Sequence, residues 1–237
     1  VGKGIMFDSG GYSLKSRMET MHGDMGGAAA VIGAIRAIAL EKLPVNVIAV
    51  VAACKNMISG DAYVPGDILF SMNGKKIEML NSDAEGRLTL ADALTYAIRK
   101  ENAGSIIDIA TLTGAAQGAV GVRSSAVFSN DEELYAEVEE ASERACEKIW
   151  RLPLDKELFP VIESEVADIQ NSAQGSTMGG GAIVAGLFLQ EFVEDHSWVH
   201  VDIAPVSWES KDIDYSIKGA TGYGVSLLYE TVKVISR

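Results

Sequence analysis

The stretch that best indicates the fold runs from residue 26 to residue 54 and reads GGAAAVIGAIRAIALEKLPVNVIAVVAAC. Its first part, 26–43, has small and apolar residues at helical spacing and ends in a basic turn, as helix C-termini prefer. Its second part, 45–54, is a β-branched apolar run with the character of a central strand in a parallel sheet. The stretch therefore predicts a helix that leads directly into a buried strand.

The same alternation continues on both sides of this stretch. Residues 1–7, VGKGIMF, predict a buried strand upstream. Downstream we expect helices at 86–100, 131–149, 179–195 and 222–235, and strands at 104–112 and 198–204. Strands that alternate with helices predict a three-layer α/β domain, in which a largely parallel mixed sheet lies between helices. Because no repeat or linker interrupts the pattern, we expect one domain over 1–237.

Composition restricts the classes of partner. The 237 residues are 48% hydrophobic, enough for a large core, and carry a formal charge of −13. That charge argues against nucleic acid as a partner, since phosphate binding needs a surplus of Lys and Arg. Cys54 and Cys146 are too few for a disulfide framework or a cysteine zinc site. We see no signal peptide and no apolar run long enough to span a bilayer, so we expect a cytoplasmic protein without a membrane partner.

Acidic side chains fall where such a fold binds ligands. Ligands of open α/β sheets lie beyond the carboxyl ends of the strands. Asp8 follows the first predicted strand, and Asp24 directly precedes the helix at 26–43. In NSDAEGRL (81–88), extended backbone would place Asp83, Glu85 and Arg87 on one side. Since oxygen ligands suit hard divalent ions, the sequence favours a metal site at the carboxyl ends of the strands.

Simpler explanations exist for each of these residues. DSGG (8–11) is a common turn sequence, and Asp24 could equally be a helix N-cap. Asp83 and Glu85 could be solvated and complement a helix dipole. Lys3 in an apolar strand is costly unless it is paired or neutral, although its amine could also reach solvent. The coincidence of three such segments in one domain favours the metal hypothesis.

Three segments resemble the signature segments of the leucyl aminopeptidase family. They are VGKGIMFDSGGYSLK (1–15), METMHGDMGGAA (18–29) and NSDAEGRLTLADAL (81–94), the last with Ser82 where the family usually has Thr. IDIATLTGA (107–115) and HVDIAPV (200–206) are similar to the family's substrate-pocket segments. Tyr12 and IWRLPL (149–154) look closer to the peptidase B branch. The resemblance covers essentially the whole chain and implies this family's catalytic domain.

The resemblance implies a role for each matching residue. Its metal ligands would be Lys3, Asp8, Asp24, Asp83 and Glu85, and its catalytic cations Lys15 and Arg87. The pocket for the first substrate residue would be lined by Met21, Thr111, Gly114, Ala204 and Ser207, with a backbone carbonyl from Leu112. It implies two divalent ions, Zn or Mn with Mg or Co also compatible, and a bicarbonate at Arg87. Lys3 must lose its proton to ligate, whereas Lys15 must stay charged.

The implied activity is hydrolysis of the N-terminal peptide bond of peptides with a free α-amine. The family also has an N-terminal domain and assembles as a homo-hexamer, so we expect this chain to be the catalytic part of a longer protein. The segment 16–23 is shorter than the family's, which could displace Lys15. Two alternatives remain: a two-metal hydrolase of phosphate esters, and a non-catalytic member with an assembly or regulatory role.

Overall fold

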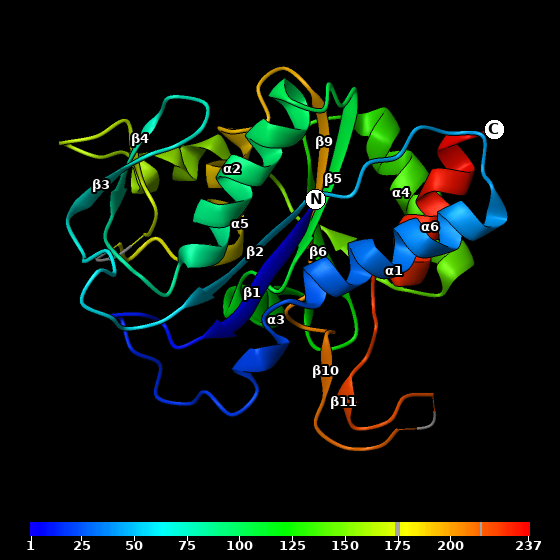
Figure 1. Cartoon of the computed structure of the whole chain (residues 1–237), viewed down its shortest axis with the longest axis horizontal. Coiled ribbons are helices and arrows are strands. Elements are labelled where there is room, and N and C mark those ends of the chain that lie inside the picture. The colour runs from blue at the N-terminus through cyan, green and yellow to red at the C-terminus, as the bar shows by residue number, and fades with distance from the viewer. Residues whose placement is uncertain (174–175, 214) are drawn as a thin grey trace.

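The computed structural model describes residues 1–173, 176–213 and 215–237. Its centre is a six-stranded sheet with the strand order β2-β1-β5-β9-β6-β7 (Figure 1). The strands are β1 (Gly2–Asp8), β2 (Val51–Asn56), β5 (Ser105–Ala110), β6 (Ser125–Ser129), β7 (Ile149–Arg151) and β9 (Ser197–Asp202). Neighbouring strands are parallel except β6 and β9, which are antiparallel. The predicted α/β fold with a largely parallel mixed sheet is confirmed.

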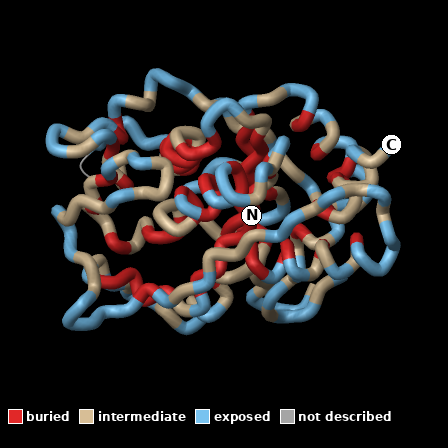
Figure 2. Tube along the Cα trace, turned by 45° about the horizontal axis from the view of Figure 1, so that its top comes forward, coloured by how far each residue is buried: buried red, intermediate tan, exposed pale blue. Residues whose placement is uncertain are grey.

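Helices cover both faces of this sheet. One face carries α1 (Gly26–Glu41), α4 (Glu132–Ala145) and α6 (Val225–Ile235), and the other α2 (Glu85–Arg99), α3 (Gly114–Val120) and α5 (Gly181–Gln190). Side chains alternate along the strands, so Val199 and Val201 of β9 join one apolar cluster and Trp198 joins the other. Buried chain runs through the middle of the molecule and exposed chain around it (Figure 2).

Shorter elements surround the main sheet. A three-stranded sheet contains β3 (Asp67–Phe70), β4 (Lys76–Met79) and β8 (Ile169–Gln170), and β10 (Trp208–Glu209) pairs with β11 (Gly219–Ala220) in a projecting hairpin (Figure 1). Two 3-10 segments are η1 (Met21–Gly23) and η2 (Lys156–Ile162). Our sequence analysis predicted none of these elements, nor β6, β7 and α3.

The predicted central strand at 45–54 is instead at the edge of the sheet. The strand begins only at Val51, and β2 is the last strand in the sheet order. A β-branched apolar run is therefore not sufficient to indicate a central strand, since residues 45–50, apolar except for Asn46, lie outside it. The helix predicted at 26–43 ends earlier, at Glu41, without a basic last turn, and Lys42 caps it in the left-handed conformation.

Among the described residues, one helical segment is long and apolar enough to cross a membrane by length and composition alone, contrary to our expectation. It is Met21–Glu41, which includes η1 and α1. In the structure, this segment is partly buried. The apolar cluster on one face of the sheet includes Ala30, Val31 and Ala34 of α1, and Ile38 of the same helix is also buried. The core helix of a globular domain has the same composition, so this segment is weak evidence for a membrane span.

The start of α1 lies unusually close to the sheet. A Cβ atom on Gly27 would overlap the carbonyl oxygen of Ile109 and lie 2.8 Å from the backbone nitrogen of Lys3. Only glycine fits between the helix and the two strands here. This contact fixes the position of the preceding residues, including Asp24, above the end of β5.

Candidate metal centre

Polar side chains gather at one edge of the main sheet. Asp8, Asn56 and Asp202 are the last residues of β1, β2 and β9, and Thr111 directly follows β5. These four strands are parallel, so their carboxyl ends meet at the same edge. Lys3 lies near the start of β1, but β1 is displaced along β5 so that Gly2 pairs with Ile109. Lys3 is therefore level with the end of β5.

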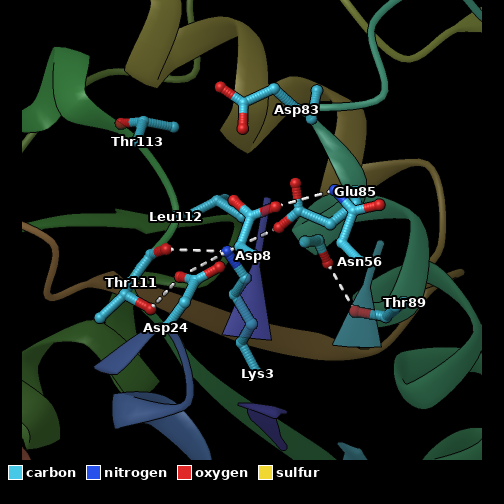
Figure 3. A network of polar contacts seen from close by, with 12 residues as sticks. Lys3, Asp8, Asp24, Asn56, Asp83, Glu85, Thr89, Thr111, Leu112 and Thr113 are labelled. Atoms are coloured by element: carbon cyan, nitrogen blue, oxygen red, sulfur yellow. Dashed lines mark hydrogen bonds and ion pairs between the residues drawn. The ribbon is translucent and has the colours of Figure 1, made fainter. Parts of the chain in front are cut away.

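The amine of Lys3 is the centre of the first half of the site (Figure 3). Its Nζ lies 2.8 Å from Asp24 Oδ1 and 3.0 Å from Glu85 Oε1, and it donates to the Thr111 carbonyl at 3.0 Å. The Thr111 hydroxyl also donates to Asp24 Oδ1, at 2.7 Å. Asp24 is thus not the helix N-cap we considered, since the N-cap of α1 is Met25.

Lys15 occupies the second half of the site. Its Nζ lies 2.9 Å from Asp8 Oδ2 and also forms an ion pair with Asp83 Oδ1. Gly10 and Gly11 have φ values of 83° and 61°, the left-handed conformation that glycine adopts readily. The resulting turn returns the chain to Asp8, whose Oδ1 accepts the amide of Gly10 at 2.8 Å. Lys15 therefore reaches the acidic cluster even though the segment 16–23 that follows it is short.

Three buried carboxylates are close enough to share a cation. One oxygen each from Asp8, Asp24 and Glu85 lies within 4.8 Å of the others. Asp24 Oδ2 and Glu85 Oε2 have no hydrogen-bond partner among the described residues. Buried carboxylate oxygens without donors are costly, and a divalent ion would remove that cost. The donor set therefore fits hard metal ions.

Asp83 and Arg87 reach the site differently from our prediction. Residues 81–84 form a turn and Glu85 begins α2, so the three side chains do not alternate along extended backbone. Asp83 is joined to the cluster through Lys15. The guanidinium of Arg87 lies over the Phe188 ring, 5.9 Å from its centroid, and the structure shows no hydrogen bond from it to another described residue.

The surrounding charges keep both lysines protonated. Burial alone would lower the pKa of Lys3, but the charges of Glu85 and Asp24 outweigh burial and raise it. The pKa of Lys15 is raised too, because its bonds to Asp83 and Asp8 outweigh burial. Burial raises the pKa of Asp24 to about 6, with Lys3 opposing and Glu85 adding to the effect. Burial lowers the pKa of Arg87 to about 10, so Arg87 also stays charged at neutral pH.

Sequence reasoning missed three residues that support the site. Asn56 Nδ2 donates to Asp8 Oδ1 and to the Ser82 carbonyl, both at 2.8 Å. The Ser82 hydroxyl donates to the Gly10 carbonyl at 2.6 Å and accepts the Ser13 amide at 2.7 Å. Asp202 accepts backbone amides from the loop after β5 and from the loop after β9. Asn56 and Asp202 are the last residues of β2 and β9, but Lys55 precedes Asn56 and the apolar residues Ile203 and Ala204 follow Asp202, so the sequence did not mark either residue as Asp8 was marked.

The residues expected to line a substrate pocket lie in three loops near this edge. Met21 belongs to η1, residues 111–113 connect β5 to α3, which begins at Gly114, and Ala204 and Ser207 follow β9. The ring of His22 contacts that of Trp208 edge-on, with centroids 5.4 Å apart, so η1 packs against the chain just after Ser207. His200 is buried, and its Nδ1 lies 2.6 Å from Asp108 Oδ1.

The class of protein defined by this fold and site is an α/β domain with a cluster of carboxylates and lysines at its strand ends. Residues 1–229 match the model of the cytosol aminopeptidase family, catalytic domain. The chain belongs to this family, as its resemblance to leucyl aminopeptidases indicated.

Named relatives agree with this membership. The chain is 55% identical to a probable cytosol aminopeptidase of Clostridium perfringens, covering 97% of this chain and 46% of the relative. It is 53% identical to one of Clostridium tetani, covering 98% and 48%. Among solved structures, the bottromycin maturation enzyme BotP in complex with Mn has a TM-score of 0.95 and 39% identity, covering 100% of this chain and 52% of that one. The chain thus spans about half the length of the relatives it matches.

Proposed function

We propose that this chain is the catalytic part of a two-metal aminopeptidase, which hydrolyses the N-terminal peptide bond of peptides with a free α-amine. The observation that carries the proposal is the buried group formed by Asp8, Asp24 and Glu85, with unpartnered oxygens and two lysine amines beside it. Family membership and the names of the relatives support it.

Five residues would hold the two ions: Lys3, Asp8, Asp24, Asp83 and Glu85. Once bound, the ions would supply Lewis-acid chemistry, which activates water and polarises the scissile carbonyl; aminopeptidases are a known example of such two-metal sites. Mn bound to BotP supports Mn as one suitable metal, and carboxylates with an amine suit Zn, Mg or Co as well. The four carboxylates carry −4, which two divalent ions would balance.

The remaining residues would act on the substrate directly. Lys15, which keeps its charge, would donate to the oxygen of the scissile carbonyl as negative charge develops there. Arg87, charged and without a described hydrogen-bond partner, is available to hold an anion such as bicarbonate. The Leu112 carbonyl would hold the first residue of the substrate, and the loops of Met21, Thr111, Gly114, Ala204 and Ser207 would line the pocket for its side chain.

Three further expectations from the sequence stay predictions. They are a cytoplasmic location, assembly as a homo-hexamer and a single domain over 1–237.

The proposal is tested with full-length protein and a panel of aminoacyl anilides. We expect chelation to abolish release of the anilide and added Mn or Zn to restore it. N-acetylated anilides should not be cleaved, because they lack the free α-amine. Cleavage of a phosphate ester but of no anilide would favour the other two-metal hydrolase, and no activity with any metal would favour a non-catalytic member.

Metal binding should weaken as the pH falls. Lys3 has a raised pKa and must release its proton to ligate, and below about pH 6 Asp24 also holds a proton that a metal must displace. Each displaced proton makes the apparent Kd for Mn rise about tenfold per unit of decreasing pH. Calorimetric Mn titrations between pH 5.5 and 8, in buffers of different ionisation enthalpy, measure both Kd and proton release. A pH-independent Kd without proton release would contradict ligation by Lys3.

A further inference from the structure

Asp202, the last residue of β9, connects two loops. The residue is 1% exposed. Its Oδ1 accepts the amides of Leu112 and Ala204, both at 3.1 Å. Its Oδ2 accepts the Thr113 amide at 3.1 Å and the Thr113 hydroxyl at 2.7 Å. One buried carboxylate therefore joins the loop after β5 to the loop after β9, on two sides of the proposed pocket.

These hydrogen bonds determine how two successive peptide planes are oriented. A trans peptide directs its carbonyl away from its own N–H, and the described chain contains no cis peptide. The N–H groups of Leu112 and Thr113 both point to Asp202, so the carbonyls of Thr111 and Leu112 point away from it. The Thr111 carbonyl accepts the amine of Lys3 at 3.0 Å (Figure 3). The Leu112 carbonyl is oriented by the same carboxylate.

We infer that Asp202 is a positioning residue for substrate binding, an inference that rests on the proposed function. It orients the Leu112 carbonyl that would hold the first residue of the peptide. Through the amide of Ala204 it also fixes the facing loop of the pocket. A neutral side chain at residue 202 would leave one of these N–H groups without an acceptor, and the loop would lose its single orientation.

Asp108 provides a matched control. It is a second fully buried carboxylate, on the neighbouring strand β5, where it pairs in register with His200. It accepts the indole N–H of Trp198 at 2.7 Å and lies 2.6 Å from His200 Nδ1. These partners lie within β9 and not in the pocket loops. Replacing Asp108 should therefore lower the stability of the fold, as replacing Asp202 would, but it should leave the pocket unchanged.

The test compares Asp202→Asn, Asp108→Asn, Thr113→Val and Thr113→Ser in the full-length, metal-loaded protein. We expect Asp202→Asn to raise KM for aminoacyl anilides about tenfold, with a smaller change in kcat, because a hydrogen bond that positions bound substrate is weakened. Thr113→Val removes the hydroxyl that donates to Asp202 and that accepts the Ala116 amide at 3.1 Å as the N-cap of α3, and it should raise KM by a smaller factor. Asp108→Asn and Thr113→Ser should leave KM within about twofold of the parent protein.

Several results would overturn the inference. It is wrong if folded Asp202→Asn has the KM of the parent protein, or if Asp108→Asn raises KM equally. Should Asp202→Asn fail to fold, Thr113→Val decides, and an unchanged KM overturns the inference. If the parent protein cleaves no anilide with any metal, the proposed function itself fails.

Discussion

Replacing Lys15 by methionine is expected to lower kcat/KM for aminoacyl anilides by about 10²- to 10³-fold in the metal-loaded, full-length protein. Lys15 is the charged donor nearest to Asp8 and Asp83, and these carboxylates hold its pKa above the usual value. Methionine has a similar length but no charge, so the fold and the proposed metal ligands should remain. The loss should appear mainly in kcat, because the donor acts on charge that develops in the transition state.

Two further variants separate this effect from general electrostatics. Lys15→Arg keeps a positive charge and should recover part of the activity. Lys76→Met removes a charge from an exposed position on β4 and should leave kcat unchanged. Bound metal, measured by elemental analysis, should be the same in all three variants. A Lys15→Met protein with full metal content and the kcat of the parent would exclude Lys15 from catalysis.

Replacing Gly86 by alanine is expected to weaken Mn binding by about 10- to 100-fold, although no ligand is removed. A Cβ atom at residue 86 would lie 2.5 Å from Lys3 Cε and 2.7 Å from Lys3 Nζ. Lys3 cannot easily move aside, since it is buried and its amine contacts Asp24, Glu85 and the Thr111 carbonyl. The alanine would therefore displace the Lys3 amine from its place between the carboxylates. Calorimetric Mn titration measures the effect.

Gly118→Ala is the matched control for this prediction. Gly118 is also helical, in α3, but a Cβ atom there would meet nothing within 4 Å among the described residues. Alanine in a helix is more favourable than glycine by about 0.5–1 kcal/mol, so this variant should be slightly more stable and bind Mn normally. Equal Mn affinity in both alanine variants would show that the position of Lys3 does not matter for binding.

Much of the fold could be predicted because local patterns and tertiary structure agree in most segments. The helices at α1, α2 and α4 and the strands at β1, β5 and β9 follow from apolar periodicity. The position of the site follows from Asp8, Asp24 and Glu85 at strand ends and helix starts. Their pairing with Lys3 and Lys15 was not evident from composition or spacing, and only the family resemblance connected these residues.

The features that were not predicted depend on distant contacts. The position of β2 at the edge is set by which strands pair, and its apolar sequence does not reveal that. The alternation of Asp83, Glu85 and Arg87 suggested side chains on one side of extended backbone, but α2, predicted from residue 86, begins at Glu85 and includes both Glu85 and Arg87. The role of Asp202 requires the loop after β5, about ninety residues earlier in the chain, to lie beside β9.

The insertion of β9 between β5 and β6 has a consequence for how the protein forms during synthesis. Until residues 197–202 leave the ribosome, β5 and β6 cannot be joined in the sheet, and both present an open edge. Long-range pairing of this kind is slow and leaves intermediates prone to aggregation. The four carboxylates of the proposed metal site, Asp8, Asp24, Asp83 and Glu85, all precede residue 86, whereas Asp202 is made much later. We therefore expect the nascent chain to assemble the proposed metal site first and to complete the proposed substrate pocket last.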